Sequence, residues 1–269
     1  MTHVPSREGT AAMPGSIQVA PSPPVQYVLR RADDALILGH RLSEWCGHAP
    51  MMEEDMALAN MGLDLIGQAR SLYAHAGTLE AAGHDEDDFA YRRDERAYVN
   101  LLLVEQPNGD FAATMLRQFL YAAFALPYWT AMMASRDATL AAIAAKAEKE
   151  MAYHLRHAGE WVVRLGDGTG ESHARAAAAL DALWPYTGEM FAVDAVERAA
   201  IEAGEGIDPS GLRPGWRAMV ARVLAQATLA MPEDGWMQQG GRQGRHSEHM
   251  GYLLAELQHV QRSIPGAVW

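Results

Sequence analysis

The sequence contains one cysteine, Cys46, among 269 residues. A single thiol excludes an internal disulfide framework and is typical of proteins from a reducing cytoplasm. Uninterrupted apolar runs that approach the ~20 residues of a membrane helix are also missing from the sequence. Residues 1–24 lack the charged start and apolar core of a signal peptide. We therefore expect a cytoplasmic protein that does not cross a membrane.

The sequence contains fewer basic than acidic residues. It has 22 lysines and arginines and 34 aspartates and glutamates, which gives a formal net charge of −12. A chain this acidic is repelled by nucleic-acid phosphates and by anionic membrane surfaces. We therefore expect neither nucleic acid nor membrane among its partners. Hydrophobic residues make up 49% of the chain, which is enough for the core of one large domain.

The N-terminal residues differ from the rest in composition. Prolines interrupt residues 1–24 at positions 5, 14, 21, 23 and 24, and no apolar periodicity is present there. We expect residues 1–24 to form a disordered extension and residues 25–269 to form the folded domain.

Strict alternation of apolar and polar residues, the pattern of half-buried strands, is missing from the sequence. From residue 26 onward alanine is abundant and apolar residues recur at steps of three and four, which predicts helices. Asp110 is a suitable N-cap for one of them, because its carboxylate can accept from free backbone N–H groups. The expected helices span residues 26–45, 53–76, 88–106, 111–133, 137–165, 172–186, 193–202, 209–229 and 247–262.

The longest expected helices contain about 20–28 residues and would be about 30–42 Å long. Helices of this length, each with one apolar stripe and joined by short turns, pack most simply as an antiparallel bundle. The segment after Gly170 is expected to wrap on this bundle as an appendage. The predicted fold is therefore all-α, an antiparallel helical bundle with additional C-terminal helices.

Helical bundles can hold a di-iron centre, which uses a glutamate from each of two helices and a Glu-x-x-His pair from each of two others. Of the eleven histidines, only His259 has an acidic residue three positions earlier, Glu256. Because a second such pair is missing, the sequence does not supply the ligand cage that two irons need. We predict that this chain has no metal, cofactor-binding or catalytic residues, and that Glu256 and His259 form an exposed pair on the last helix.

Asp64, Glu150 and His154 remain candidates for the bundle interior, because they border apolar stripes. One interpretation is a hydrogen-bonded core histidine beside a glutamate that pairs with Lys146, one helical turn earlier. The other is that the three are remnants of a metal centre now held by hydrogen bonds. In either case a buried Asp64 needs a basic partner from a neighbouring helix.

Three further patterns point less clearly to chemistry. Cys46 and His48 are two residues apart and would lie on different faces of a helix, which argues against a nucleophile pair. The glycine-rich turn at 166–170 lacks the spacing of a dinucleotide-binding loop. Residues 242–247 could bind an anion, since two arginines precede a helix start there. The alternatives for that loop are a solvated surface or contact with an acidic neighbour.

Several long strings in the sequence resemble the C subunits of bacterial phenylacetyl-CoA epoxidases. They are LSEWCGHAP at 42–50, LANMGLDLIGQAR at 58–70 and NLLLVEQPNGDF at 100–111. Shorter matches are SRD at 135–137, KEMAYHLR at 149–156 and HSEHMG at 246–251. The resemblance covers about residues 26–269, and the length of these strings makes it specific.

This resemblance implies a ferritin-like fold and a place in a multicomponent monooxygenase. In that family a homologous A subunit carries the di-iron centre and binds the CoA thioester, and the C subunit pairs with it as a structural component. A reductase with FAD and an iron–sulfur cluster supplies electrons from NADPH. The assembly converts phenylacetyl-CoA and O2 to a ring 1,2-epoxide in aerobic phenylacetate breakdown. No catalytic residue of the family carries over to this chain.

Two other functions compete with this expectation. An autonomous ferritin-like di-iron oxidase or iron-binding protein would need the ligands that the histidine spacing fails to supply. A helical scaffold for an unrelated partner would not associate with an oxygenase A subunit.

Overall fold

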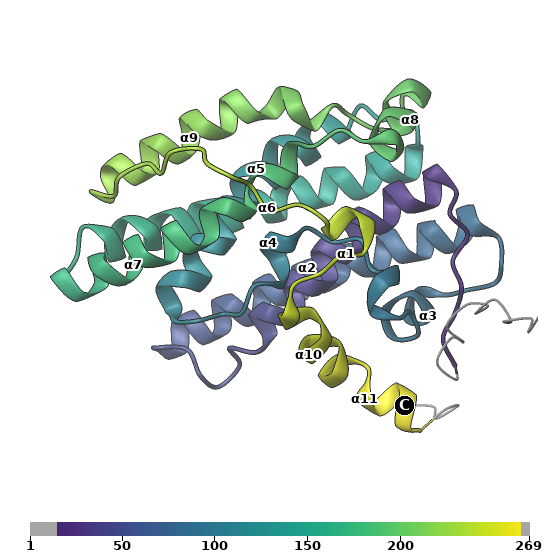
Figure 1. Cartoon of the computed structure of the whole chain (residues 1–269), viewed down its shortest axis with the longest axis horizontal. Helices are drawn as coiled ribbons and strands as arrows, with labels where there is room; N and C mark the ends of the chain where they lie inside the picture. The colour runs from purple at the N-terminus through teal and green to yellow at the C-terminus, as the bar shows by residue number, and fades with distance from the viewer. Residues whose placement is uncertain (1–14, 265–269) are drawn as a thin grey trace, which may run out of the picture.

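The computed structural model describes residues 15–264, and within that range it contains helices and no strand. Four long helices form the body: α1 (Pro23–Ser43), α2 (Met52–Glu80), α5 (Phe111–Met132) and α6 (Ala138–Gly166) (Figure 1). α1 packs along α2, α5 packs along α6, and α2 also contacts α6. Short turns join the members of each pair, so the two helices of a pair run antiparallel. The prediction of an all-α, ferritin-like bundle is confirmed.

The C-terminal half covers part of this bundle, as predicted. α7 and α9 pack on α5 and α6, whereas α8 packs on α1. An arm without long helices then returns across the front of α1 in Figure 1 and leads into α10 and α11. The helices of this half are α7 (Gly170–Leu183), α8 (Ala195–Ala203), α9 (Arg213–Gln226), α10 (Glu248–Leu257) and α11 (His259–Ser263). The 3₁₀ helices are η2 (Trp184–Tyr186), η3 (Gly188–Phe191), η4 (Pro209–Leu212) and η5 (Gly241–Gln243).

Local sequence explains where the long helices begin and end. The Asp110 carboxylate accepts from the backbone N–H of Ala113 at 3.0 Å, which confirms the predicted N-cap of α5. Asp137 caps α6 in the same way. α6 ends at Gly166, where a Cβ atom would collide with the backbone carbonyl of Ala227. Glycine is required there because the arm after α9 crosses the end of α6 at close range.

Residues 88–106 do not form the single helix that we predicted. The segment contains α3 (Glu86–Tyr91), the 3₁₀ helix η1 (Glu95–Ala97) and the short α4 (Leu102–Glu105). Two carboxylates of α1 keep the intervening backbone extended. Asp33 accepts from the N–H of Val99 at 2.8 Å, and Asp34 accepts from the N–H of Leu101 at 2.7 Å. These N–H groups are therefore not available for helical hydrogen bonds.

The predicted terminal helix at 247–262 is divided at Gln258. The buried amide of Gln258 donates to the backbone carbonyl of Arg93 at 3.0 Å and to the hydroxyl of Tyr98 at 2.9 Å. Glu256 and His259 are both exposed, as predicted, but they lie on α10 and α11, on opposite sides of this break, and not on one helix.

The helical body starts slightly earlier than the expected boundary at residue 24, because α1 begins at Pro23. Just before it, the backbone N–H of Ile17 donates to the carbonyl of Arg92 at 2.8 Å. The Ala20 N–H also donates to a carboxylate oxygen of Glu80 at 3.1 Å. The later part of the expected extension therefore lies against the bundle, whereas its first 14 residues fall outside the described range.

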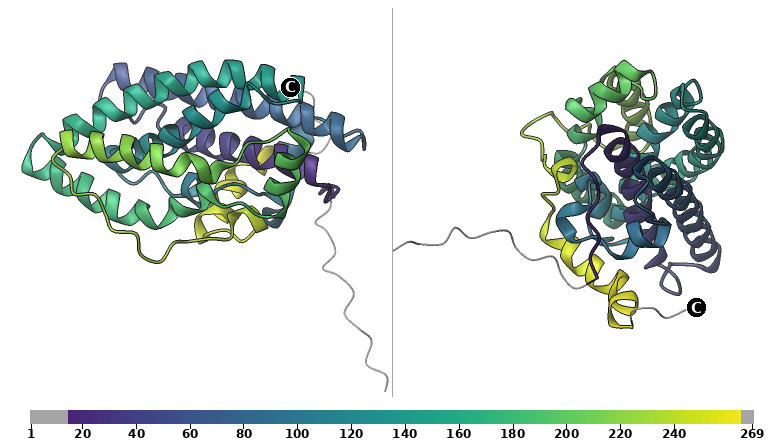
Figure 2. Two further views of the ribbon diagram at one scale, coloured as in Figure 1. Left: turned by 90° about the horizontal axis from the view of Figure 1, so that it is seen from above. Right: turned by 90° about the vertical axis from the view of Figure 1, so that its right-hand side faces the viewer.

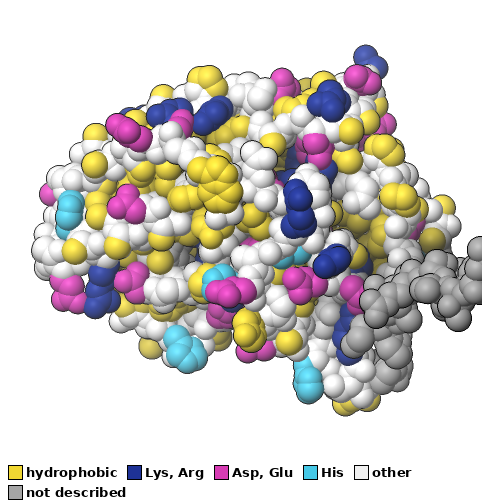
Figure 3. Space-filling view, in the orientation of Figure 1, with side chains coloured by type: hydrophobic (Ala, Val, Ile, Leu, Met, Phe, Trp, Pro, Cys, Tyr) yellow, Lys and Arg dark blue, Asp and Glu magenta, His cyan; other side chains and the backbone are white. Residues whose placement is uncertain are grey.

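The face of the molecule seen in Figure 3 carries acidic and basic side chains interspersed with hydrophobic ones. Within residues 15–264, no helix combines the length and apolar character needed to cross a bilayer. The cytoplasmic localisation that we expect stays a prediction.

Candidate functional site

Polar side chains from three bundle helices meet between α2, α5 and α6. They are Asp64 and Gln68 on α2, Gln118 on α5, and Glu150 and His154 on α6, and we call them the central cluster. His154 and Gln118 are fully buried, and Gln68 is almost so. Because the residues come from facing sides of the helices, the bundle itself sets their positions.

His154 is hydrogen-bonded through both nitrogens of its ring. The Gln118 amide nitrogen lies 3.0 Å from Nδ1, and a carboxylate oxygen of Asp64 lies 3.2 Å from Nε2. An amide N–H can only donate, so Nδ1 is the acceptor and Nε2 carries the proton that Asp64 accepts. The predicted basic partner of Asp64 is therefore confirmed, although the Asp64 side chain is 36% exposed rather than buried.

Glu150 has the ion-pair partner that its spacing predicted. The Lys146 ammonium lies 3.3 Å from its carboxylate, one turn earlier on α6. The amide of Gln68 also donates to Glu150 at 2.8 Å. Glu150 is therefore connected to α2 through Gln68, and His154 is connected to α2 through Asp64.

We tested whether the central cluster fits a di-iron centre. Its oxygen and nitrogen donors are two carboxylates, two neutral amides and one imidazole whose nitrogens are both engaged. Within the described part of the chain, no three His, Cys, Asp or Glu side chains are grouped so that they could hold a metal ion. A di-iron centre needs about six protein ligands. The side chains of the central cluster therefore do not fit a di-iron centre.

Two amide oxygens of the central cluster, those of Gln68 and Gln118, are buried without a hydrogen-bond partner. Burying an acceptor without a donor costs free energy, so buried polar groups are nearly always paired. No donor from residues 15–264 reaches either oxygen.

A second polar region surrounds α1 and is built on buried ion pairs. We call it the α1 network, and its buried ion pairs are Asp33–Arg93, Asp34–Arg242, Glu105–His246 and Arg31–Glu197. Besides Arg93, Asp33 accepts from the Tyr73 hydroxyl at 2.6 Å and from the Val99 N–H. Asp33 and Arg93 are both fully buried. Every oxygen of this carboxylate thus has a donor.

The glycine-rich loop before α10 binds carboxylates of its own chain. Arg242 contacts Asp34 through both terminal nitrogens, at 2.8 and 2.9 Å. Glu105 accepts from the backbone N–H of Ser247 at 2.6 Å and from the His246 ring at 2.8 Å. The sequence did not predict this arrangement, because Arg242 is buried and binds a carboxylate of its own chain and is not part of a solvated or docking surface.

The surroundings of this network shift several pKa values, among them those of His246, Asp194 and Asp34. Burial lowers the pKa of His246, but the hydrogen bond and charge of Glu105 outweigh it, so the pKa lies above its usual range. Burial raises the pKa of Asp194, but hydrogen bonds from Arg30 and the backbone lower it to about 2. The shifts at His246 and Asp194 favour the charged form, whereas burial raises the pKa of Asp34 although Arg242 faces it.

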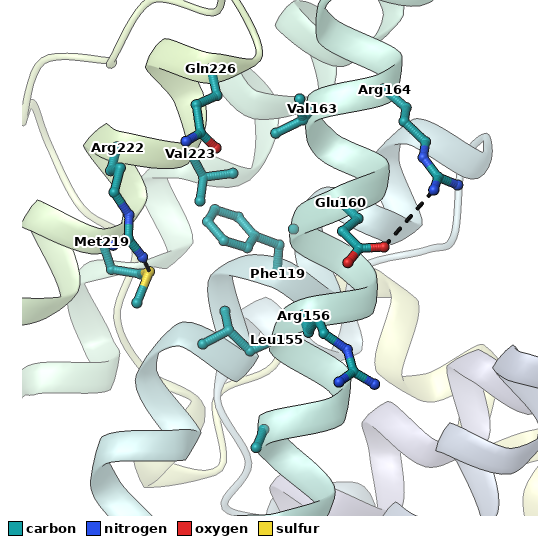
Figure 4. A pocket seen from close by; sticks show the side chains of 12 residues that line it. Phe119, Leu155, Arg156, Glu160, Val163, Arg164, Met219, Arg222, Val223 and Gln226 are labelled. Carbon is teal, nitrogen blue, oxygen red and sulfur yellow. Dashed lines mark hydrogen bonds and ion pairs between the residues drawn. The ribbon is translucent and has the colours of Figure 1, made fainter.

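The remaining candidates are on the surface. Cys46 is exposed, and the His48 ring bonds the backbone carbonyl of Cys46 at 3.0 Å rather than its thiol. An open groove of about 530 Å³ lies between α6 and α9. Figure 4 shows the ring of Phe119 between the two helices. The groove's only acid, Glu160, is exposed and lies 3.9 Å from Arg164. Neither place combines a buried acid or base with a nucleophile.

A family model described as "Phenylacetic acid catabolic protein" matches residues 10–269. The chain belongs to this family. It is also similar to the C subunit of 1,2-phenylacetyl-CoA epoxidase from Escherichia coli (strain K12), with 49% identity over 243 residues. That match covers 90% of this chain and 98% of the relative. The resemblance inferred from the sequence strings is confirmed at the level of family and subunit type.

Sequence reasoning missed Gln118 and the charged residues of α1. Gln118 lies seven positions after Phe111, on the same apolar stripe, and that spacing predicts an inward side chain. Arg30, Arg31, Asp33 and Asp34 interrupt an otherwise apolar helix that is buried along most of its length. Charged residues on a buried helix require partners of opposite charge. These four residues could therefore have indicated the α1 network from the sequence.

Proposed function

We propose that this chain is the C-type subunit of a 1,2-phenylacetyl-CoA epoxidase and acts in phenylacetate catabolism. It pairs with a catalytic A subunit that holds the di-iron centre and epoxidises the ring of phenylacetyl-CoA. A reductase component with FAD and an iron–sulfur cluster delivers electrons from NADPH. The family match and the similarity to the C subunit of an epoxidase over almost its whole length support this proposal.

The observation that carries the non-catalytic role is the composition of the central cluster. His154 has hydrogen bonds at both ring nitrogens, and Glu150 is engaged by Lys146 and Gln68. In a dimetal centre, carboxylates and imidazoles must instead be free to donate electron pairs to metal. The contribution of the chain is then mechanical: a rigid bundle that holds the helices of its partner in place.

Reconstitution tests the proposal. Phenylacetyl-CoA, O2, NADPH, the reductase and the A subunit are mixed with or without this chain, and the epoxide product is quantified by mass spectrometry. We expect product only when the chain is present. Full activity in its absence would overturn the proposed role.

Metal analysis separates the proposal from an autonomous di-iron oxidase. The chain is purified alone, incubated with Fe(II) under anaerobic conditions, desalted and analysed for iron. We expect far less than one equivalent of bound iron. If the isolated chain retained two equivalents and oxidised the thioester with a chemical reductant, the alternative would replace our proposal.

Association separates the proposal from an unrelated scaffold. We expect the chain and the A subunit to co-elute as one species in size-exclusion chromatography. Separate elution at micromolar concentrations would favour the unrelated scaffold.

A further inference from the structure

The outer side of α2 is apolar, although it faces away from the bundle. Met52, Met56, Ala59, Leu63 and Ile66 follow one another at steps of four, three, four and three, and we call them the α2 seam. The exposed fractions are 77% for Met52, 61% for Met56, 65% for Leu63 and 38% for Ile66. The core-facing residues of α2, such as Leu58, Met61 and Leu65, lie on its opposite side and are fully buried. α2 thus has two apolar faces.

Single exposed apolar residues are normal, but a continuous stripe of them is not. The outer face of a helix at the surface is ordinarily polar. Apolar residues that alternate at steps of three and four form the contact line of paired helices, because this spacing keeps them on one side of the helix. The pattern of the α2 seam therefore fits another helix as its occupant.

The chain's own appendage leaves this side of the bundle open. α8 covers α1, and α7 and α9 cover α5 and α6. In the left view of Figure 2 the C-terminal arm runs along one edge of the molecule, and α2 lies toward the opposite edge. Within the described residues, the elements that pack most extensively on α2 are α1, α6 and α3. These contact its inner side and flanks and leave the α2 seam exposed.

Basic residues border the α2 seam on the α6 side. Lys146 and Lys149 are the only lysines in the sequence, and both are exposed on α6. The Lys146 ammonium lies 3.7 Å from the position that a Cβ atom on Gly67 would occupy, which places it beside the seam. Tyr153, 37% exposed, lies one to two turns further along α6. A chain with a net charge of −12 thus places the Lys146 ammonium at the edge of this apolar surface, and Lys149 follows three residues later on α6.

We propose that the α2 seam, with Lys146, Lys149 and Tyr153, is the surface that binds the catalytic subunit. The occupant is a helix of that subunit, with its own apolar residues at steps of three and four and acidic residues along the edge that meets α6. This inference rests on the proposed function and specifies where the pairing occurs. The seam is about 21 Å long, and a stable interface buries about 1,200–2,000 Å². A seam of this length is too short to bury that area alone, so the proposed contact also includes the neighbouring surface of α6.

Charge insertion tests the seam directly. Leu63→Arg places a guanidinium in the middle of the seam, where pairing would bury it without a partner. We expect affinity for the catalytic subunit, measured by biolayer interferometry with both full chains, to fall by about 30-fold or more. Tyr252→Arg on α10 is the matched control, because Tyr252 is a similarly exposed large apolar residue, at 76%. The Tyr252→Arg variant should bind the catalytic subunit with the affinity of the wild type.

Both variants change residues that are mostly exposed, so each should fold normally, and thermal unfolding of the isolated chains verifies this. Unchanged affinity of a folded Leu63→Arg variant would overturn the assignment. The assignment would also be overturned if the isolated wild-type chain self-associated and Leu63→Arg abolished this self-association. The seam would then bind a second copy of the chain.

The two lysines provide a second measurement on the unaltered protein. The free chain and the complex are treated with an amine-acetylating reagent, and peptides containing Lys146 and Lys149 are quantified by mass spectrometry. We expect both lysines to react in the free chain and to be protected in the complex. If a complex forms while both lysines stay fully reactive, the interface lies elsewhere and the proposed function survives. If no complex forms, both proposals fail together.

Discussion

The central cluster and the α1 network are both polar regions inside one bundle, but they differ in charge and burial: the α1 network is built on buried ion pairs, whereas the central cluster joins neutral amides to partly exposed charges. In the α1 network, Asp33 and Asp34 each face an arginine and a backbone N–H. In the central cluster, the amide oxygens of Gln68 and Gln118 have no partner, and Asp64 is partly exposed. The first region therefore keeps its charges buried and paired, whereas the second leaves charged groups in contact with solvent.

The two regions also differ in what they connect. The central cluster joins helices that already pack together through apolar residues. The α1 network joins α1 to segments that are distant in the sequence, since Asp34 and Arg242 are 208 residues apart. Burying ion pairs adds little net stability, but removing one partner is costly. We infer that the α1 network fixes the position of the arm, whereas the central cluster tolerates change.

The largest effect should follow from breaking the Asp33–Arg93 pair. Arg93→Met leaves the Asp33 carboxylate buried without its counter-charge, and we expect the free energy of unfolding to fall by about 3–5 kcal/mol. Urea unfolding followed by circular dichroism measures this loss. The neighbouring Arg92 pairs with Asp88 at the surface, so Arg92→Met should cost no more than about 1 kcal/mol. Equal losses would remove the distinction between buried and exposed pairs.

A somewhat smaller effect is expected at the attachment of the arm. Arg242→Met removes the charge that faces Asp34 and should lower the free energy of unfolding by about 3 kcal/mol. It should also make residues 227–241 sensitive to limited proteolysis, because the arm loses its anchor. Arg245, exposed on the same loop, provides the control. Arg245→Met should leave both the unfolding curve and the cleavage pattern unchanged, and faster cleavage in that variant would contradict our interpretation of Arg242.

A substitution in the central cluster should lower the free energy of unfolding by a smaller amount. Gln118→Leu removes one unpartnered oxygen but leaves Nδ1 of His154 without a donor, so we expect a loss of about 1 kcal/mol. Urea unfolding under the same conditions allows direct comparison with Arg93→Met. A loss as large as that of Arg93→Met would show that the two regions are equally important for stability.

The smallest effect concerns pH. Because the pKa of His246 is raised in the folded chain, its contribution to stability is complete below the unfolded pKa of about 6.5. This contribution is lost as the pH rises through the higher folded pKa. We expect the free energy of unfolding to decline over that range in the wild type and to decline less in His246→Gln. Identical pH profiles would exclude a role for the His246–Glu105 pair.

The sequence alone determined the features that depend on neighbours within a few residues. Helical periodicity located the long helices, Asp110 was identified as a cap from its place before a stripe, and Lys146 was paired with Glu150 one turn later. The family resemblance came from contiguous strings in the same way. These inferences hold because the geometry of a helix fixes which residues at short spacing lie together.

Only the tertiary structure decided the contacts between distant segments. The carboxylates of α1 hold residues 99 and 101 extended, and Arg242 binds Asp34 instead of an external anion. The exposure of Leu63 likewise depends on where α7 to α11 settle on the bundle. Local spacing carries no information on such pairings, because they depend on how the whole chain packs and on which buried charges then find a partner.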